Sequence, residues 1–223
     1  MYEALKTTTP SRHAERAAFD ADVVHGILDE ALIGHLAFVA DGRPQVLPLL
    51  FVRIGGSIYI HGSTGAHPAR LVVREGRLEV GFEVTLVDGL VLARSAFSHS
   101  ANYRSVVAHG ELTLVGEVVR KEAVLRALMD KLVPGRADDA RSPEEGELRK
   151  TAVMELRLAE VGAKVRTGGP LDDERDLGLP VWAGVWPIVT SRGMLEPATN
   201  LSAHVPLPSY LAEGGPVVAG LTT

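Results

Sequence analysis

The segment Ser57-Ile58-Tyr59-Ile60-His61-Gly62-Ser63-Thr64-Gly65 has the pattern of a strand that ends in small polar residues and turns directly into a short helix. The strand alternates its side chains between two faces, and the helix is expected over residues 65–74. Ser63 and Thr64 place hydroxyl and backbone N–H groups where this helix begins, and Gly65 lets a ligand approach the backbone. Free N–H groups at a helix start favour phosphate, although an ordinary N-cap without a ligand has the same pattern.

Short strands with turn residues between them surround this segment. Asp41-Gly42, Gly55-Gly56 and Asp88-Gly89 are turn signals. The expected strands are 33–40, 45–54, 57–62, 78–87, 90–96, 103–115 and 152–164. The other expected helices are 21–32, which Asp20 caps and Gly34 ends, 119–133, and a short one that starts at the capping box Ser142-Pro143-Glu144-Glu145. Many short strands in this order are typical of a barrel or a sandwich.

The composition limits the classes of protein to which this chain can belong. It has 223 residues, of which 46% are hydrophobic, so one globular domain with a useful core is expected. The net charge of −5 argues against a general nucleic-acid role, and the absence of cysteine excludes disulfides and thiolate chemistry. Residues 1–16 lack the apolar core of a signal peptide, and no apolar run is long enough to span a bilayer. A soluble, cytoplasmic protein is therefore expected.

Three motifs in order resemble those of a known family. His61-Gly62-Ser63 and the segment 102–112 (NYRSVVAHGEL) are similar to motifs of the FMN-binding split-barrel proteins, in the pyridoxamine 5′-phosphate oxidase-like family. The most similar branch includes the 5-nitroimidazole-resistance proteins. Val181-Trp182-Ala183-Gly184-Val185-Trp186-Pro187 resembles a stretch near the C-terminus of that branch. The resemblance covers roughly residues 20–187 and is more specific for the fold and for FMN than for any reaction.

The resemblance implies a mainly β fold, namely an antiparallel split β-barrel of six or seven strands, of Greek-key type, with a few helices. Residues 1–19 would form an N-terminal arm and 20–165 the FMN-binding barrel domain. Residues 166–223 would form a C-terminal arm that packs on the barrel or on a partner subunit. Relatives work as homodimers with two sites at the interface, and a small open barrel has sheet edges that a second copy can cover.

The resemblance also implies which residues hold FMN. Ser63, beside His61 and Gly62, would bind the phosphate, and Val46, Leu47, Pro48 and Leu49 would run along the flavin ring. Relatives carry a Lys or Arg near the position of His67, and Arg70 is the substitute cation here. A second phosphate contact is expected from Arg104, flanked by Tyr103 and Ser105, and a cover over the ring from Trp186. The plain alternatives are a structural histidine, a surface ion pair at Arg104 and simple packing of the tryptophan.

The implied function is FMN-dependent redox chemistry on a small organic molecule, with a nitro-aromatic compound as the leading candidate. An FMN-dependent oxidoreductase is therefore expected, but no side chain is an obvious general acid or base, so no catalytic residue is assigned. Pyridoxamine-phosphate oxidation is disfavoured because a basic pocket for a second phosphate is not evident. Two alternatives remain open: a non-enzymatic flavin-binding or storage protein, and a haem-binding relative, for which no residue is diagnostic. The histidines lack the spacing of a metal site.

Overall fold

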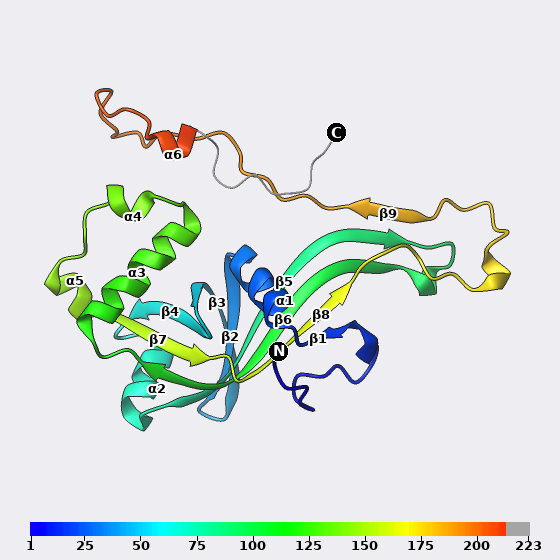
Figure 1. Cartoon of the computed structure of the whole chain (residues 1–223), viewed down its shortest axis with the longest axis horizontal. Helices are drawn as coiled ribbons and strands as arrows, with labels where there is room; N and C mark the ends of the chain where they lie inside the picture. The colour runs from blue at the N-terminus through cyan, green and yellow to red at the C-terminus, as the bar shows by residue number, and fades with distance from the viewer. Residues whose placement is uncertain (213–223) are drawn as a thin grey trace.

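The computed structural model describes residues 1–212, and these form a nine-stranded antiparallel sheet with helices around it (Figure 1). The strands are β1 (Ala17–Ala18), β2 (Ile33–Ala40), β3 (Arg43–Ile54), β4 (Ser57–Ser63), β5 (Leu78–Leu92), β6 (Ser100–Leu114), β7 (Thr151–Arg157), β8 (Glu160–Arg166) and β9 (Gly184–Pro187). The α-helices are α1 (Ala21–Glu30), α2 (His67–Glu75), α3 (Val118–Leu132), α4 (Arg136–Asp139), α5 (Glu145–Lys150) and α6 (Ser209–Ala212). Short 3₁₀ turns are η1 (Ala14–Arg16), η2 (Ala96–Ser98) and η3 (Glu174–Asp176).

Six of the strands close into a ring. The order is β6-β7-β4-β3-β2-β5, and β5 pairs back onto β6. Strands β5 and β6 have 15 residues each, so they extend beyond the ring as a long two-stranded ribbon (Figure 1). On this ribbon β8 and β1 lie outside β6, and β9 lies outside β5. The predicted mainly β split barrel is therefore confirmed, with three further strands on its edges.

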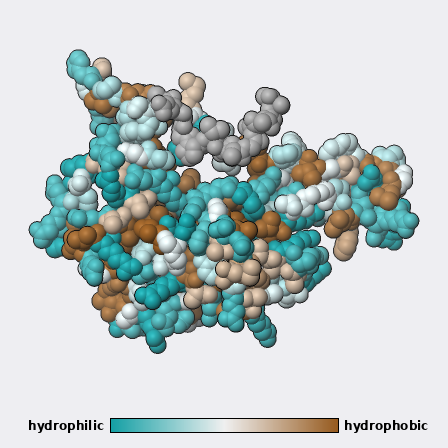
Figure 2. Space-filling view, viewed as in Figure 1, coloured by the Kyte–Doolittle hydropathy of each residue, from teal (hydrophilic) through white to brown (hydrophobic). Residues whose placement is uncertain are grey.

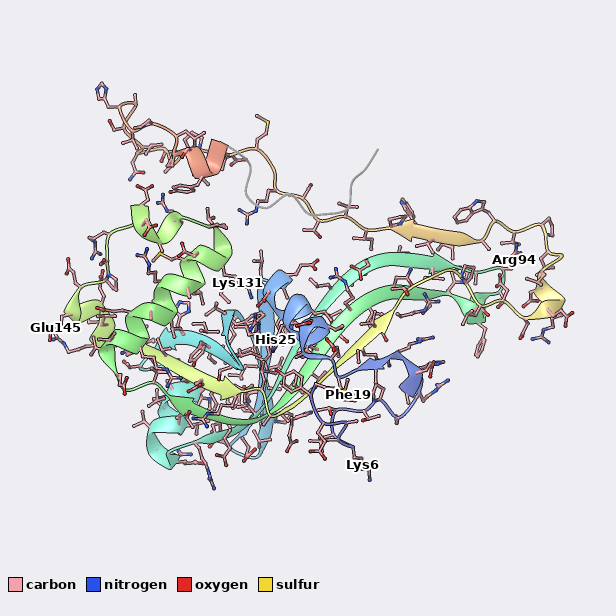
Figure 3. All side chains as sticks on the ribbon, viewed as in Figure 1. Lys6, Phe19, His25, Arg94, Lys131 and Glu145 are labelled. Atoms are coloured by element: carbon pink, nitrogen blue, oxygen red, sulfur yellow. The ribbon has the colours of Figure 1, made fainter. Side chains whose placement is uncertain are left out.

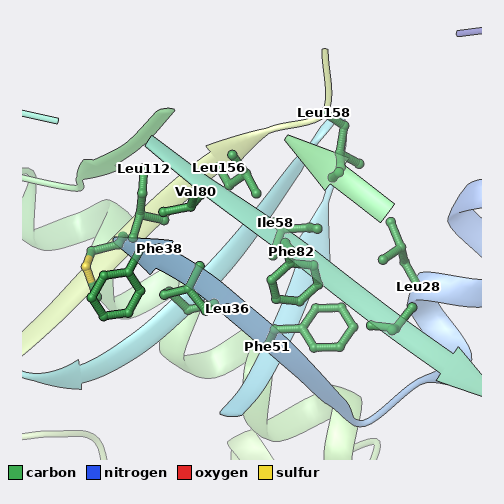
Figure 4. Close-up of a cluster of buried hydrophobic side chains, with 14 of the residues drawn as sticks. Leu28, Leu36, Phe38, Phe51, Ile58, Val80, Phe82, Leu112, Leu156 and Leu158 are labelled. Atoms are coloured by element: carbon green, nitrogen blue, oxygen red, sulfur yellow. The ribbon is translucent and has the colours of Figure 1, made fainter. Parts of the chain in front are cut away.

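The interior of the ring is apolar because alternate residues of every strand point inward. Phe51 and Phe82 meet edge to face with their centroids 5.0 Å apart, and Leu36, Ile58 and Leu156 pack in the same buried cluster (Figure 4). Helices α1 and α2 add their own apolar faces to this cluster. Their contribution explains why two short helices with single apolar stripes fold onto a small barrel.

Helix α3 packs on the outer side of the ring over a second apolar cluster, which includes Val52 and Val153. A buried polar group fixes the helix there: Ser57 and Tyr59 each donate a hydrogen bond to Oε1 of Glu155, at 2.8 and 2.9 Å. Arg120 of α3 lies 3.0 Å from the other oxygen. Burial opposes ionisation of Glu155, but the two hydrogen bonds and the charges of Arg120 and Arg157 together outweigh it, so the pKa of Glu155 lies below its ordinary value.

Lys131 makes the contact between α3 and α1. Its Nζ donates to the carbonyl of Leu28 at 2.9 Å and lies 3.5 Å from the centroid of the Phe51 ring (Figure 3). Burial lowers the pKa of Lys131 to about 8, against the smaller opposite effect of Asp29. The amine is thus a partly desolvated cation held between a carbonyl dipole and an aromatic face.

Several predicted elements are confirmed and several are wrong. Helix α1 is capped as predicted, because Asp20 accepts from the N–H groups of Asp22 and Val23, but it ends at Glu30 rather than at Leu32, and Gly34 is not its terminating residue. Gly34 lies inside β2, where an added Cβ would be 2.1 Å from Cζ of Phe82. Glycine is required there by the close approach of the ring and not by a helix end.

Three strand and helix boundaries also need correction. The predicted strands 78–87 and 90–96 are one strand, β5, which passes Asp88-Gly89 with a bulge and pairs there with β9. The predicted strand 152–164 is two strands, β7 and β8. The capping box belongs to Glu144 and Glu147 rather than to Ser142, so α5 begins at Glu145. Each error comes from a pairing partner or cap that the local pattern does not reveal.

The C-terminal segment leaves the barrel at β8 and returns as an extended arm along the ribbon and towards α4 (Figure 1). Asp172, buried, pairs with Arg94 at 2.8 Å, and β9 then adds to the edge of β5. Further on, Arg192 donates to the carbonyl of Leu132 and Tyr210 donates to Asp139. The structure describes the predicted arm 166–223 as far as residue 212, and residues 213–223 lie outside the described part. No helix in residues 1–212 has the length and apolarity to cross a membrane.

Candidate flavin site

The ring is split beside β3. Strand β3 pairs with β2 along Arg43–Leu50, but it pairs with β4 only over Phe51–Ile54. Over 43–50 the other edge of β3 therefore has no strand partner within residues 1–212. An unpaired edge presents a row of backbone N–H and C=O groups. This is the segment that was expected to run along the flavin ring.

The four predicted residues of this segment point to both sides of the sheet. Leu47 and Leu49 pack against the barrel core, whereas Val46 and Pro48 lie on the outer face of the ring. Val46 is 60% exposed. Pro44 and Pro48 have no N–H, so this segment of β3 lacks two backbone donors.

The turn from Ser63 to Ala66 leads into α2 and leaves donors free. Oγ of Ser63 accepts from the N–H of Gly65 at 3.1 Å, which leaves its own hydroxyl proton available. Helix α2 has Ala66 at its N-cap, with no side-chain cap, and proline near its start. Within residues 1–212 the N–H groups of His67 and Ala69 have no hydrogen-bond partner. These free donors have the arrangement that binds an anion.

The cations near this turn differ in their partners. Arg70 is exposed and has no carboxylate within 4.0 Å in the described chain, while Arg74, one turn later, pairs with Glu75 at 2.6 Å. The ring of His67 instead packs edge-on against Phe38, with centroids 6.0 Å apart. Arg70 is therefore the available positive charge on α2.

His61 has an unsatisfied nitrogen. Its Nδ1 is buried and has no hydrogen-bond partner in the described chain. Burial lowers the pKa of His61, so the ring is neutral at neutral pH. A buried polar atom without a partner is costly and uncommon in native proteins, and a ligand group is one way to satisfy it. The free β3 edge, the free donors of α2 and this nitrogen together fit a polar, phosphate-bearing cofactor.

Arg104 does not join this group within one chain. Its guanidinium is held by Glu30 and by Asp88, and these hydrogen bonds, with Glu30 the larger effect, raise its pKa. Arg104 pairs with Leu86 of β5 on the ribbon, whereas Ser63 pairs with Thr151 at the start of β7 in the ring. The ion pair that was the plain alternative is present.

The remaining predicted residues share one surface, which we call the outer sheet face. It consists of the outward-pointing side chains of β3, β2, β5 and β6, in that order across the sheet. Val46, Pro48, Tyr103 and Ser105 lie on it by strand alternation. Trp186 pairs with Leu90, which pairs with Ala101 of β6, so it extends the same face on the ribbon and is 66% exposed. Figure 2 shows hydrophobic residues along the ribbon.

The sequence patterns missed two residues of this face, His35 and Glu83. They are direct neighbours across β2 and β5. Nothing local connects a histidine to a glutamate 48 residues later, and the alternation of β2 only shows that His35 points away from the core. Register between strands far apart in the chain was needed to bring them together.

Comparison with known proteins agrees with this geometry. Residues 20–165 match the family model described as pyridoxamine 5′-phosphate oxidase. The chain belongs to the pyridoxamine 5′-phosphate oxidase-like family. It is a flavin-binding split-barrel family, and the predicted resemblance is confirmed. Among curated proteins no match was found.

Two solved structures are similar over nearly the whole chain. The flavocytochrome Anf3 from Azotobacter vinelandii is 35% identical, with a TM-score of 0.88 over 94% of this chain and 96% of Anf3. The FAD and haem binding protein from Mycobacterium smegmatis is 31% identical, with a TM-score of 0.83 over 90% of this chain and 97% of that protein. A 5-nitroimidazole antibiotic resistance protein from Bacteroides thetaiotaomicron is 18% identical, with a TM-score of 0.54 over 67% of this chain and 86% of its own, which shows the fold alone.

Proposed function

We propose that this protein is a flavin-dependent redox protein that carries haem as a second cofactor. The observation that carries the flavin assignment is the free edge of β3 next to the unsatisfied Nδ1 of His61 and the open start of α2. The haem assignment is supported by the two similar structures above 30% identity, which are named a flavocytochrome and a FAD and haem binding protein. The haem assignment corresponds to the haem-binding alternative that the sequence left open.

The residues around the turn would bind the flavin phosphate. The hydroxyl of Ser63 and the N–H groups of His67 and Ala69 donate to phosphate oxygens, and Arg70 adds positive charge. The neutral ring of His61 satisfies its buried nitrogen on a polar group of the cofactor. The backbone edge of β3 orients the flavin ring. When bound, the flavin supplies the hydride or electron transfer, and these residues supply binding, orientation and exclusion of water.

We favour FAD over the FMN that the sequence predicted. The M. smegmatis protein that is 31% identical over 90% of the chain is named for FAD. A nitro-aromatic substrate remains a prediction, because the resistance protein shares the fold alone. A small organic or inorganic electron acceptor is the substrate class that we propose, with no side chain assigned as acid or base.

We also propose that the protein acts as a homodimer. The outer sheet face exposes Ile33, Val39 and Val46, and an apolar face of this kind is stabilised by a partner. The arm exposes Trp182 and Trp186, two large side chains that gain most from burial. In the dimer the arm of one copy covers the flavin site of the other, and the ribbon residues Tyr103 and Ser105 approach the partner's flavin.

Anaerobic reduction of the purified 223-residue protein tests the redox proposal. NADH, NADPH and dithionite are added in turn while the absorption spectrum is recorded. Bleaching of flavin bands with a shift of the haem band supports a redox protein with two communicating cofactors. Bound flavin that no electron donor reduces, and that is released unchanged, would identify a carrier and overturn the proposal.

A further inference from the structure

The outer sheet face carries a histidine and a carboxylate that the flavin site does not use. His35 on β2 is directly opposite Glu83 on β5. Nδ1 of His35 lies 3.2 Å from Oε2 of Glu83, and the side chains are 46% and 37% exposed. The other oxygen of Glu83 accepts a hydrogen bond from the hydroxyl of Thr85, on the same strand. Glu83 therefore lies between His35 and Thr85 on one face.

This arrangement leaves one nitrogen of His35 ready to bind a ligand. A carboxylate next to Nδ1 favours the tautomer that carries its proton there, which leaves a lone pair on Nε2. Within residues 1–212 the one polar contact of His35 is through Nδ1, so Nε2 has no protein partner. Histidines that bind metals commonly have a carboxylate at the second ring nitrogen, where it fixes the ring and increases its basicity.

The neighbours of His35 are polar on the β5 side, where Glu83 and Thr85 lie, and apolar on the β2 and β3 side. Pro48 pairs with His35 on one side, and Val46 and Ala37 occupy the next row. Gly81 continues that row, where a Cβ would meet His109 at 3.7 Å and Ala37 at 3.8 Å. Because Gly81 has no side chain, no group projects from the sheet between His35 and His109.

These surroundings favour a haem iron over a free metal ion. The described residues contain no group of three or more side chains that could enclose a free ion. A metal that brings its own equatorial ligands in a flat apolar ring needs only one axial nitrogen and an apolar surface, and haem is such a group.

We propose that Nε2 of His35 is an axial ligand of the haem iron, with Glu83 as a positioning residue and Thr85 holding Glu83. The inference rests on the proposed function, in that it requires haem to bind. Because His35 is the cross-strand neighbour of Pro48, the ligand lies one strand away from the free β3 edge assigned to the flavin. The other histidine of this face, His109, has no carboxylate within 4.0 Å in the described chain and serves as the matched control.

The test compares the purified 223-residue protein with His35→Ala, His109→Ala and Glu83→Gln. Each is titrated with haemin, and haem content, Soret position and bound flavin are measured. His35→Ala should lose the wild-type Soret position and bind haem at least about 10-fold more weakly, and added imidazole should restore the spectrum. Glu83→Gln should weaken haem binding by about 10-fold. His109→Ala should match the wild type, and flavin content, which reports folding, should be equal in all four proteins.

Two results separate the failure of this inference from that of the proposed function. Wild-type protein that takes up no haem overturns the proposed haem cofactor and this inference with it. Wild-type protein that binds haem while His35→Ala keeps the same spectrum and affinity overturns this inference alone. Loss of the band on substitution of His61, His67 or His109 would then assign the ligand elsewhere.

Discussion

Arg70 provides a sharp test of the phosphate site, because Arg74 offers a matched control on the same helix. Arg70→Gln removes the one α2 cation without a carboxylate partner in the described chain. Arg74→Gln removes an equal charge one turn further along, where Glu75 already neutralises it. Both side chains are exposed, so neither substitution disturbs the core.

The size of the effect follows from the exposure of Arg70. A hydrogen bond to a charged group contributes about 1.5–3 kcal/mol, and an exposed pair lies at the lower end. A loss of about 1.4 kcal/mol weakens binding about 10-fold. Adding Ser63→Ala removes one hydroxyl donor and should weaken binding by about a further 5-fold. The contribution of Arg70 should shrink as salt rises, because exposed charges are screened.

The assay is titration of the flavin-free protein with FAD and with FMN at low and at high salt. Binding is measured from the quenching of flavin fluorescence. We expect the dissociation constant to rise about 10-fold in Arg70→Gln and to stay unchanged in Arg74→Gln. Equal behaviour of the two variants, or no salt dependence in the wild type, would refute the assignment of the phosphate to the start of α2.

Three further predictions test the rest of the account. Gly34→Ala places a Cβ against the buried Phe82 ring and should lower the free energy of unfolding in urea by about 1–3 kcal/mol. Gly26→Ala, which has open space in α1, should not destabilise the protein. Equal effects of the two substitutions would contradict the packing of Gly34 on Phe82. Arg104→Gln should lower the free energy of unfolding by about 1 kcal/mol, since Glu30 and Asp88 lose their cation. The same substitution should leave flavin affinity unchanged. A large loss of affinity would show that Arg104 belongs to the flavin site. Because the pKa of Lys131 is about 8 in the folded protein and higher when unfolded, stability should rise with pH from about 8 to about 10.5, and Lys131→Met should remove that rise in unfolding curves.

Local patterns were sufficient for much of the barrel. Alternation predicted β2 at its observed bounds, and Asp41-Gly42 forms the tight turn after it with both residues at positive φ. Gly76 ends α2 at φ 81°, in the left-handed region that favours glycine. These features depend on neighbours within a few residues, which a sequence shows directly.

Long-range pairing could not be predicted in the same way. β5 continues past Asp88 because β6 pairs with it on one side and β9, almost a hundred residues later, pairs with it on the other. In the site, His61 and Ser63 were identified from one short segment. Arg104 was harder to place, because Glu30 lies 74 residues earlier in the chain and meets it only once α1 packs on the ribbon. His35 and Glu83 become neighbours only through strand register.

The most direct test of the central claim is the absorption spectrum of the purified protein, with mass identification of everything released on denaturation. The purified protein should show flavin bands together with a Soret band, and should release FAD and haem. Flavin bands with FMN and no haem would contradict the two-cofactor proposal and return the chain to the function first predicted from its sequence. A colourless protein that takes up neither flavin nor haem when they are added would contradict the account as a whole.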